Sequence, residues 1–132
     1  MKQRVVIVTT GGTIAMITDP ATGASVPAQG LNKHVADVDG LKDVACTEHY
    51  EFSNIPSPYI NPETMWALSK VVQKLLDREE VCGVVITHGT DTLEETAYFL
   101  DLTVRSEKPI ICTAAMRNID EMGTDGPRNV LS

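Results

Sequence analysis

The stretch VVIVTTGGTIAM, residues 5–16, decides the fold class of this chain of 132 residues. Four β-branched apolar residues, 5–8, run into a glycine pair, 11–12, which is followed by Thr13. A continuous run of this kind is typical of a strand that is buried on both faces, as in a parallel sheet. The turn after the strand needs the glycines but not the hydroxyl of Thr13. We therefore treat Thr13 as a candidate functional residue.

Three further segments have the character of strands. Residues 84–87 form a second short apolar run, residues 44–53 alternate less cleanly and suit a strand nearer an edge, and residues 109–116 form a fourth candidate. Short β-branched runs bounded by turn residues support these assignments.

Helix signals lie between the strands. Asn61 and Pro62 provide an N-cap followed by proline at the first helical position. Residues 92–95 have the form of a capping box, and a third helix start is expected at residues 125–127. Residues 31–38 are a further candidate helix. The buried stripes expected for the first two helices are Met65, Leu68, Val72, Leu75 and Leu76, and Leu93, Ala97, Leu100 and Val104. Strands that alternate with helices predict an α/β fold with a parallel sheet.

Two of the predicted strands end in polar turns. In a parallel sheet the ligand lies outside the carboxyl ends of the strands. The first strand is followed by residues 9–13, TTGGT, and the third by residues 87–92, THGTDT. We expect the two glycine turns to present Thr13 and Thr90 to one crevice, with Asp91 beside them. The start of the following helix adds a partial positive charge, which favours an anionic group or an oxyanion.

Structural explanations compete for each of these residues taken alone. Asp91 can cap its helix, Thr90 can be a turn residue, and His88 fits a packed, hydrogen-bonded histidine better than a general base. The glycine pair 11–12 lacks the spacing of a dinucleotide or P-loop motif. The occurrence of two such clusters at equivalent positions favours a functional site.

Composition excludes some classes of partner. A net charge of −7 argues against binding to nucleic acid or to an anionic membrane, and no apolar stretch approaches transmembrane length. Cys46, Cys82 and Cys112 are widely spaced and form no CxxC pair. Buried free thiols in a reducing cytoplasm are the expected state.

The polar turns resemble a known family. TGGTIA at residues 10–15 and HGTDTLEETAYFLDLTV at residues 88–104 look like the two signature motifs of the bacterial-type L-asparaginases. The resemblance continues, in order, through residues 54–63, 114–118 and 125–129. It implies that residues 1–132 form most of the amino-terminal domain of a longer protein, with the carboxy-terminal domain absent from this chain.

The resemblance implies a flavodoxin-like fold with three layers, a parallel sheet and helices on both faces, which is incomplete in this chain. It also implies hydrolysis of L-asparagine to L-aspartate and ammonia through an acyl-enzyme, without a cofactor or metal. The expected partner is a small amino-acid amide, with a homo-oligomer at full length, a cytoplasmic location, and neither nucleic acid nor membrane.

Roles for individual residues follow from the same resemblance. Thr13 would be the nucleophile and Thr90 the second catalytic threonine. Asp91 would be the third catalytic residue and would bind the α-ammonium of the substrate. Ser57 would bind the α-carboxylate. The backbone N–H groups of Gly12 and Thr90 would form the oxyanion hole. The substrate-binding set is Ser57, Asp91, Thr90, Gly12 and Gly89.

Three features depart from the family pattern. The loop of residues 17–30 contains no tyrosine, and Val26 stands where the activating tyrosine is expected. Pro58 follows Ser57, where many members have glutamine. The family's catalytic lysine lies beyond residue 132, and Lys108 does not match it. A fragment of a longer protein is therefore expected, ahead of a truncated product or a piece that needs a partner chain.

Other functions stay open at this stage. A related amidase could act on glutamine or a D-amino-acid amide, or could be the amidase subunit of a tRNA amidotransferase. A non-catalytic module could use Thr13, Thr90, Asp91 and Ser57 to bind an amino acid without hydrolysing it. An unrelated flavodoxin-like domain would make both threonine motifs coincidental.

Overall fold

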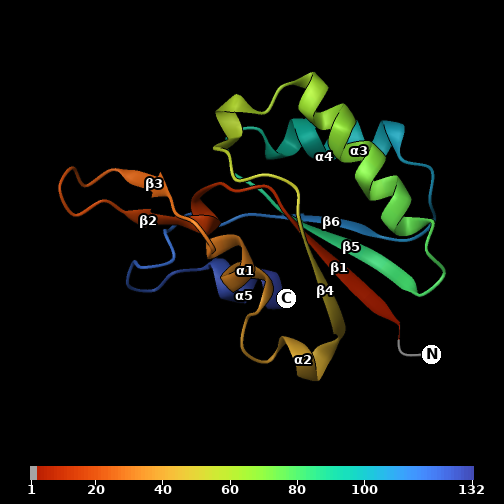
Figure 1. Cartoon of the computed structure of the whole chain (residues 1–132), viewed down its shortest axis with the longest axis horizontal. Coiled ribbons are helices and arrows are strands. Elements are labelled where there is room, and N and C mark those ends of the chain that lie inside the picture. Colours follow the sequence, from red (N-terminus) through yellow and green to blue (C-terminus); the bar gives the residue numbers. More distant parts are fainter. Residues whose placement is uncertain (1–2) are drawn as a thin grey trace.

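Four parallel strands form the central sheet of the computed structural model, which describes residues 3–132 (Figure 1). The strands β1 (Arg4–Thr9), β4 (Cys46–Glu51), β5 (Val81–Thr87) and β6 (Ile110–Thr113) lie in the order β4-β1-β5-β6. The first strand of the sequence is thus internal, as in flavodoxin-like sheets. The predicted α/β class is confirmed, and so is the edge position of β4.

Helices cover both faces of the sheet (Figure 1). The helices α3 (Pro62–Leu76) and α4 (Leu93–Thr103) pack on one face, and α1 (Leu31–Ala36) and α5 (Gly126–Leu131) lie on the other. Alternate residues of β1 supply both cores: Val6 and Val8 pack with α3 and α4, whereas Ile7 packs with α1 and α5. Because successive side chains of a strand point to opposite faces, an unbroken apolar run is what a three-layer fold requires.

The N-cap predicted for α3 is confirmed. The Asn61 side chain accepts a hydrogen bond from the Thr64 N–H at 2.9 Å, and Pro62 occupies the first turn. All five residues of the predicted stripe are buried. The capping residue, the proline and the apolar spacing therefore specify the same helix start and the same buried face.

The capping box predicted for α4 is wrong. Thr92 is the N-cap residue, but its side chain makes no capping hydrogen bond. Its hydroxyl donates instead to the carbonyl of Ser57 at 2.9 Å. Ser57 opens a 3-10 turn, η2 (Ser57–Tyr59), that lies against the start of α4. The Thr92 hydroxyl thus donates to a distant carbonyl and does not accept from the Glu95 N–H, as a capping box requires.

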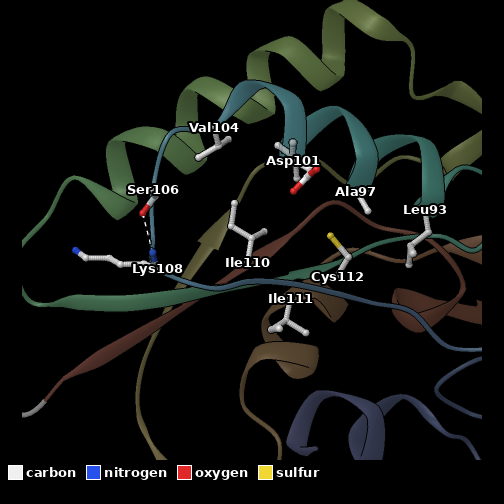
Figure 2. Close-up of a pocket in the computed structure, with 10 residues that line it drawn as sticks. Leu93, Ala97, Asp101, Val104, Ser106, Lys108, Ile110, Ile111 and Cys112 are labelled. Carbon is white, nitrogen blue, oxygen red and sulfur yellow. Dashed lines mark hydrogen bonds between the residues drawn. The ribbon is translucent and has the colours of Figure 1, made fainter.

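The stripe predicted for α4 is only partly buried. Leu100 is buried, whereas its three companions are half-buried beside β6, which has a strand neighbour on one side only. They line a hollow of about 530 Å³ between α4 and β6 (Figure 2). The residues concerned are Leu93, Ala97 and Val104. The face of α4 beyond β6 is therefore less covered than the sequence predicted.

Several short elements were not predicted. β2 (Met16–Thr18) and β3 (Ser25–Pro27) form an antiparallel hairpin that projects from the body (Figure 1). The hairpin is held by Asn118, whose amide donates to the hydroxyls of Thr18 and Ser25 at 3.1 and 2.9 Å. The other short elements are η1 (Thr13–Ala15) and α2 (Leu41–Val44).

Two further observations concern membrane-spanning helices and the cysteines. No helix within residues 3–132 is long and apolar enough to cross a membrane. Cys46, Cys82 and Cys112 are free, as predicted, but they are half-buried and not buried.

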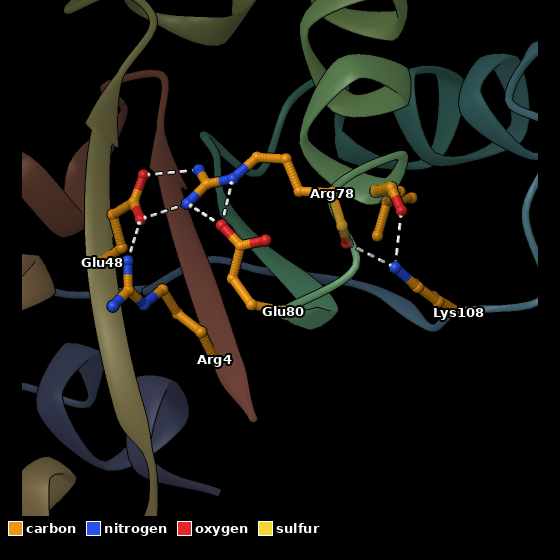
Figure 3. A network of polar contacts seen from close by, with 6 residues as sticks. Arg4, Glu48, Arg78, Glu80 and Lys108 are labelled. Atoms are coloured by element: carbon orange, nitrogen blue, oxygen red, sulfur yellow. Dashed lines mark hydrogen bonds and ion pairs between the residues drawn. The ribbon is translucent and has the colours of Figure 1, made fainter. Parts of the chain in front are cut away.

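An ion-pair network ties together the ends of the sheet where the strands begin (Figure 3). Glu48 of β4 accepts hydrogen bonds from Arg78 at 2.8 and 2.9 Å and from Arg4 at 2.9 Å. Arg78 also pairs with Glu80 at 2.8 Å. The hydrogen bonds from Arg78, and secondarily from Arg4, lower the pKa of Glu48 to about 2. The network joins β1, β4 and the segment that leads into β5.

This low pKa predicts an acid-dependent loss of stability. An unfolded glutamate titrates near pH 4.3, so the ionised Glu48 stabilises the fold above that pH, and the contribution disappears as the pH falls towards 2. We expect Glu48→Gln to lower the free energy of unfolding by about 1 kcal/mol at pH 7, a value reduced for solvent screening because the side chain is 31% exposed.

Urea unfolding of both proteins between pH 7 and pH 2.5 measures this effect. The difference in the free energy of unfolding between the wild type and Glu48→Gln should shrink steadily below pH 4.5. Glu107→Gln is the matched control, since Glu107 is exposed and its side chain makes no hydrogen bond or ion pair within residues 3–132. A Glu48→Gln penalty of constant size over the whole range would contradict the assignment.

A candidate active site at the carboxyl ends of two central strands

The two glycine turns predicted from the sequence lie side by side. In the strand order, β4 lies next to β1 towards one edge of the sheet, and β6 lies next to β5 towards the opposite edge. The chain therefore runs from β1 to one edge and from β5 to the other. The carboxyl ends of β1 and β5 are therefore the switch point of the sheet, where ligands bind in open α/β folds. Thr9 and Thr87 are paired residues at these ends. The predicted proximity of the two strand ends is confirmed.

Backbone contact between the turns explains the glycines. Gly12 has φ +86° and ψ 179°, a conformation that is almost restricted to glycine. A Cβ at Gly12 would lie 2.4 Å from the Cα of Gly89. A Cβ at Gly89 would in turn lie 2.5 Å from the hydroxyl oxygen of Ser57. Gly12, Gly89 and Ser57 thus form one continuous contact that leaves no room for added atoms.

Both candidate catalytic threonines follow these glycines directly. Thr13 begins the 3-10 turn η1 and is half-buried, whereas Thr90 is exposed. The turns are tied together by Thr10, whose hydroxyl donates to the Thr87 carbonyl at 2.8 Å. Within residues 3–132, the backbone N–H groups of Gly12 and Thr90 make no hydrogen bond. The meeting of the two turns therefore places hydroxyl groups, and N–H groups that are unpaired among residues 3–132, at one edge of the sheet.

Ser57 and Asp91, 34 residues apart, are brought into contact. The Asp91 N–H donates to the Ser57 hydroxyl oxygen at 3.1 Å, and that hydroxyl donates to the Asp91 carboxylate at 3.3 Å. Ser57 is only 1% exposed, whereas Asp91 is exposed. Together with the bond from Thr92, these contacts fix the start of α4 against η2. In this structure Ser57 holds Asp91, and Asp91 is the residue that faces solvent.

His88 is packed and hydrogen-bonded, as predicted. It is 1% exposed, and its two ring nitrogens lie 2.7 Å from the Gly89 carbonyl oxygen and 2.9 Å from the Thr96 hydroxyl oxygen. Burial lowers the pKa of His88. A neutral ring whose nitrogens both have partners is not available as a general base.

The departures from the family pattern lie at defined places. Val26 lies on β3 opposite Ile17, and Pro58 is exposed on η2. The Lys108 ammonium donates to the carbonyl oxygens of Leu76 and Arg78, each at 2.7 Å, at the end of the sheet remote from the crevice (Figure 3). Lys108 thus satisfies carbonyl groups at the end of α3, in agreement with the prediction that it is not the catalytic lysine.

The hollow beside β6 is separate from the two glycine turns. None of the predicted site residues lines it (Figure 2). Its walls are mostly apolar residues of α4 and β6. The candidate site is therefore defined by the meeting of two turns and not by an enclosed cavity.

Comparison with known proteins identifies the family to which these turns belong. The family model for the amino-terminal part of asparaginase matches residues 4–132. The chain belongs to the asparaginase family. The resemblance predicted from residues 10–15 and 88–104 is confirmed.

The asparaginase relatives are similar over nearly the whole chain. Glutaminase-asparaginase of Pseudomonas aeruginosa is 45% identical over 132 residues, which cover 96% of this chain and 36% of the relative. L-asparaginase 2 of Escherichia coli is 43% identical over 128 residues, with 96% and 36% covered. The crystal structure of a probable cytoplasmic L-asparaginase from Campylobacter jejuni matches with a TM-score of 0.87 and 40% identity, covering 98% of this chain and 40% of that one. The chain thus spans less than half the length of these asparaginase relatives.

Proposed function

We propose that the protein to which this chain belongs is an asparaginase-type amidohydrolase that converts L-asparagine to L-aspartate and ammonia. The observation that supports this most strongly is the contact between the Gly12 and Gly89 turns at the switch point of the sheet. Relatives at 39–45% identity carry the names L-asparaginase 2 and glutaminase-asparaginase. On this proposal residues 1–132 form most of the amino-terminal domain.

The chemistry proceeds through an ester on Thr13. The hydroxyl oxygen of Thr13 attacks the side-chain amide carbon, the C–N bond breaks, and ammonia leaves with the proton that the hydroxyl gives up. Water then cleaves the ester and releases aspartate. The free N–H groups of Gly12 and Thr90 stabilise the oxyanion that forms in each step. The hydroxyl of Thr90, adjacent to this donor, serves as the second catalytic threonine.

Substrate recognition is assigned to the Ser57–Asp91 pair. The exposed Asp91 carboxylate binds the α-ammonium. Ser57 keeps accepting the Asp91 N–H, and its hydroxyl hydrogen turns from the Asp91 carboxylate to the α-carboxylate of the substrate. Gly89 leaves the space for this approach, since any side chain there would strike Ser57. The recognised ligand is thus an amino-acid amide with both α-groups free.

A base must accept the Thr13 proton, and it is proposed to come from outside residues 3–132. His88 is neutral and fully engaged, and the nitrogen of Lys108 is bound at the other end of the sheet. We therefore propose that the remaining part of the protein supplies this group, and, from the resemblance to the asparaginases, that the whole protein is a homo-oligomer. A cytoplasmic location is proposed from the free thiols.

Ammonia release by the longest natural form of the protein tests the proposal, with L-asparagine, L-glutamine and D-asparagine compared. Hydrolysis of L-asparagine is the expected result. A higher rate with L-glutamine would favour the glutaminase alternative, which the Pseudomonas relative and Pro58 support. Binding of L-asparagine without ammonia release would instead indicate a non-catalytic amino-acid-binding module.

Asp91→Asn is expected to lower kcat/KM for L-asparagine by about 10- to 100-fold, mainly through KM, because a hydrogen bond to a charged group is worth about 1.5–3 kcal/mol. Succinamate, which lacks the α-ammonium, should be hydrolysed equally slowly by the wild type and by the variant. Asp101→Asn, an exposed change on α4, is the control. An equal loss with both substrates would show that Asp91 does not bind the ammonium.

A further inference from the structure

His88 occupies a buried position beside the Gly89–Thr90 turn. It directly follows β5, and its ring lies between the Gly89 carbonyl and Thr96 of α4. Thr96 is 0% exposed, so this contact is removed from solvent. The proposed chemistry makes no direct use of either side chain.

The hydrogen-bond partners define where the ring protons lie. A carbonyl oxygen can only accept, so the Nδ1 atom of His88 carries the proton that is donated to Gly89. Burial keeps the ring neutral, because it lowers the pKa of His88. The Nε2 atom therefore accepts, and the Thr96 hydroxyl donates to it at 2.9 Å. The chain of bonds runs in one direction, from Thr96 through His88 to the Gly89 carbonyl.

The Gly89 carbonyl belongs to the same peptide unit as the Thr90 N–H. No peptide bond is cis in the described chain, and in a trans peptide the C=O and N–H bonds point in opposite directions. A carbonyl that is held towards the buried ring therefore directs the Thr90 N–H away from it. Thr90 and Asp91 are exposed on that side.

We propose that His88 is a positioning residue, which fixes the orientation of the Gly89–Thr90 peptide and thereby aims the Thr90 N–H at the oxyanion. This inference rests on the proposed function. Gly89 has no side chain that could restrict the rotation of this peptide, and glycine is the residue with the most backbone freedom. Thr96 supports the ring from behind by fixing its tautomer and its orientation.

The oxyanion is absent from the substrate complex and develops only as Thr13 or water attacks, so a misaligned donor affects kcat more than KM. Loss of an oxyanion donor outright costs about 10²–10³ in kcat, and misalignment costs less. We expect His88→Leu to lower kcat for L-asparagine about tenfold while KM changes less than about twofold. His88→Asn, whose side-chain amide can replace the Nδ1–H donor, should recover most of kcat.

Steady-state kinetics on the natural protein, corrected for the folded fraction, tests the inference. A purely structural role of the histidine would lower stability in both variants, and kcat per folded molecule would not differ between them. Wild-type kcat in folded His88→Leu, or no rescue by His88→Asn, would overturn the positioning role while the proposed function stands. A wild type that releases no ammonia would overturn both.

If His88→Leu does not fold, Thr96→Val provides the second test. Valine has nearly the shape of threonine and removes only the donor to Nε2. We expect kcat to fall about threefold with KM unchanged, because the ring loses its support but keeps its bond to Gly89. Unchanged kcat in this variant would contradict the inference.

Discussion

Replacement of Thr13 by alanine is expected to lower kcat for L-asparagine hydrolysis by about 10⁴-fold or more, the loss typical of removing a catalytic nucleophile. Thr13 directly follows Gly12, whose N–H makes no hydrogen bond within residues 3–132 and is the proposed oxyanion donor. Without its hydroxyl no ester can form, although the substrate can still bind. KM and the affinity for aspartate should therefore change little.

Ammonia release and aspartate binding, measured on the same preparations, test this expectation. Thr13→Ser keeps a hydroxyl and should retain a measurable fraction of the activity. Thr47→Ala is the control, since Thr47 lies near the start of the edge strand β4, at the end of the sheet opposite the two glycine turns. Activity of Thr13→Ala within tenfold of the wild type would exclude Thr13 as the nucleophile.

Gly12→Ala is expected to destabilise the protein by more than about 3 kcal/mol and to abolish activity. The backbone conformation of Gly12 is almost restricted to glycine, and the added methyl group would lie 2.4 Å from the Cα of Gly89. The two turns could then remain in contact only if one of them moved. Such a movement would displace both proposed oxyanion donors.

Gly30→Ala is a control for an alanine at positive φ that meets no neighbour, although Gly30 is left-handed with ψ −9° whereas Gly12 has ψ 179°. Gly30 has φ +80°, close to the +86° of Gly12, but a Cβ at Gly30 would meet no atom within 4 Å. The cost of this change should be only that of a left-handed alanine, about 1 kcal/mol. Urea unfolding of the two variants separates the cost of an alanine at positive φ from the additional cost of the contact with Gly89 and of the extended backbone of Gly12. Equal destabilisation would show that the contact between the turns contributes nothing.

The predictions from the sequence were most successful for features that depend on residues close together in the chain. The β-branched run of β1, the Asn61 cap and the apolar spacing of α3 each depend on neighbours within a few residues, and each was predicted correctly. The position of the two glycine turns followed from the rule that ligands bind at the carboxyl ends of parallel strands. The family resemblance added roles for Thr13 and Asp91 that neither periodicity nor charge could supply.

The features that were missed depend on partners far along the chain. The hydroxyl of Thr92 was assigned to its own helix, but it bonds to the carbonyl of Ser57, 35 residues away. The β2–β3 hairpin consists of strands of three residues, which are too short for a periodic pattern, and its anchor, Asn118, lies about a hundred residues away. The network around Glu48 likewise joins three separate segments. No local pattern signals such contacts.

The central claim is that Thr13 forms an ester with the substrate, and rapid acid quenching during turnover tests it most directly. The natural protein is mixed with L-asparagine, quenched within milliseconds and digested, and its peptides are mapped by mass spectrometry. We predict that one aspartyl group is attached to the peptide that contains Thr13 and that it is absent from Thr13→Ala. An aspartyl group on another residue, or ammonia release that persists in Thr13→Ala, would contradict the account.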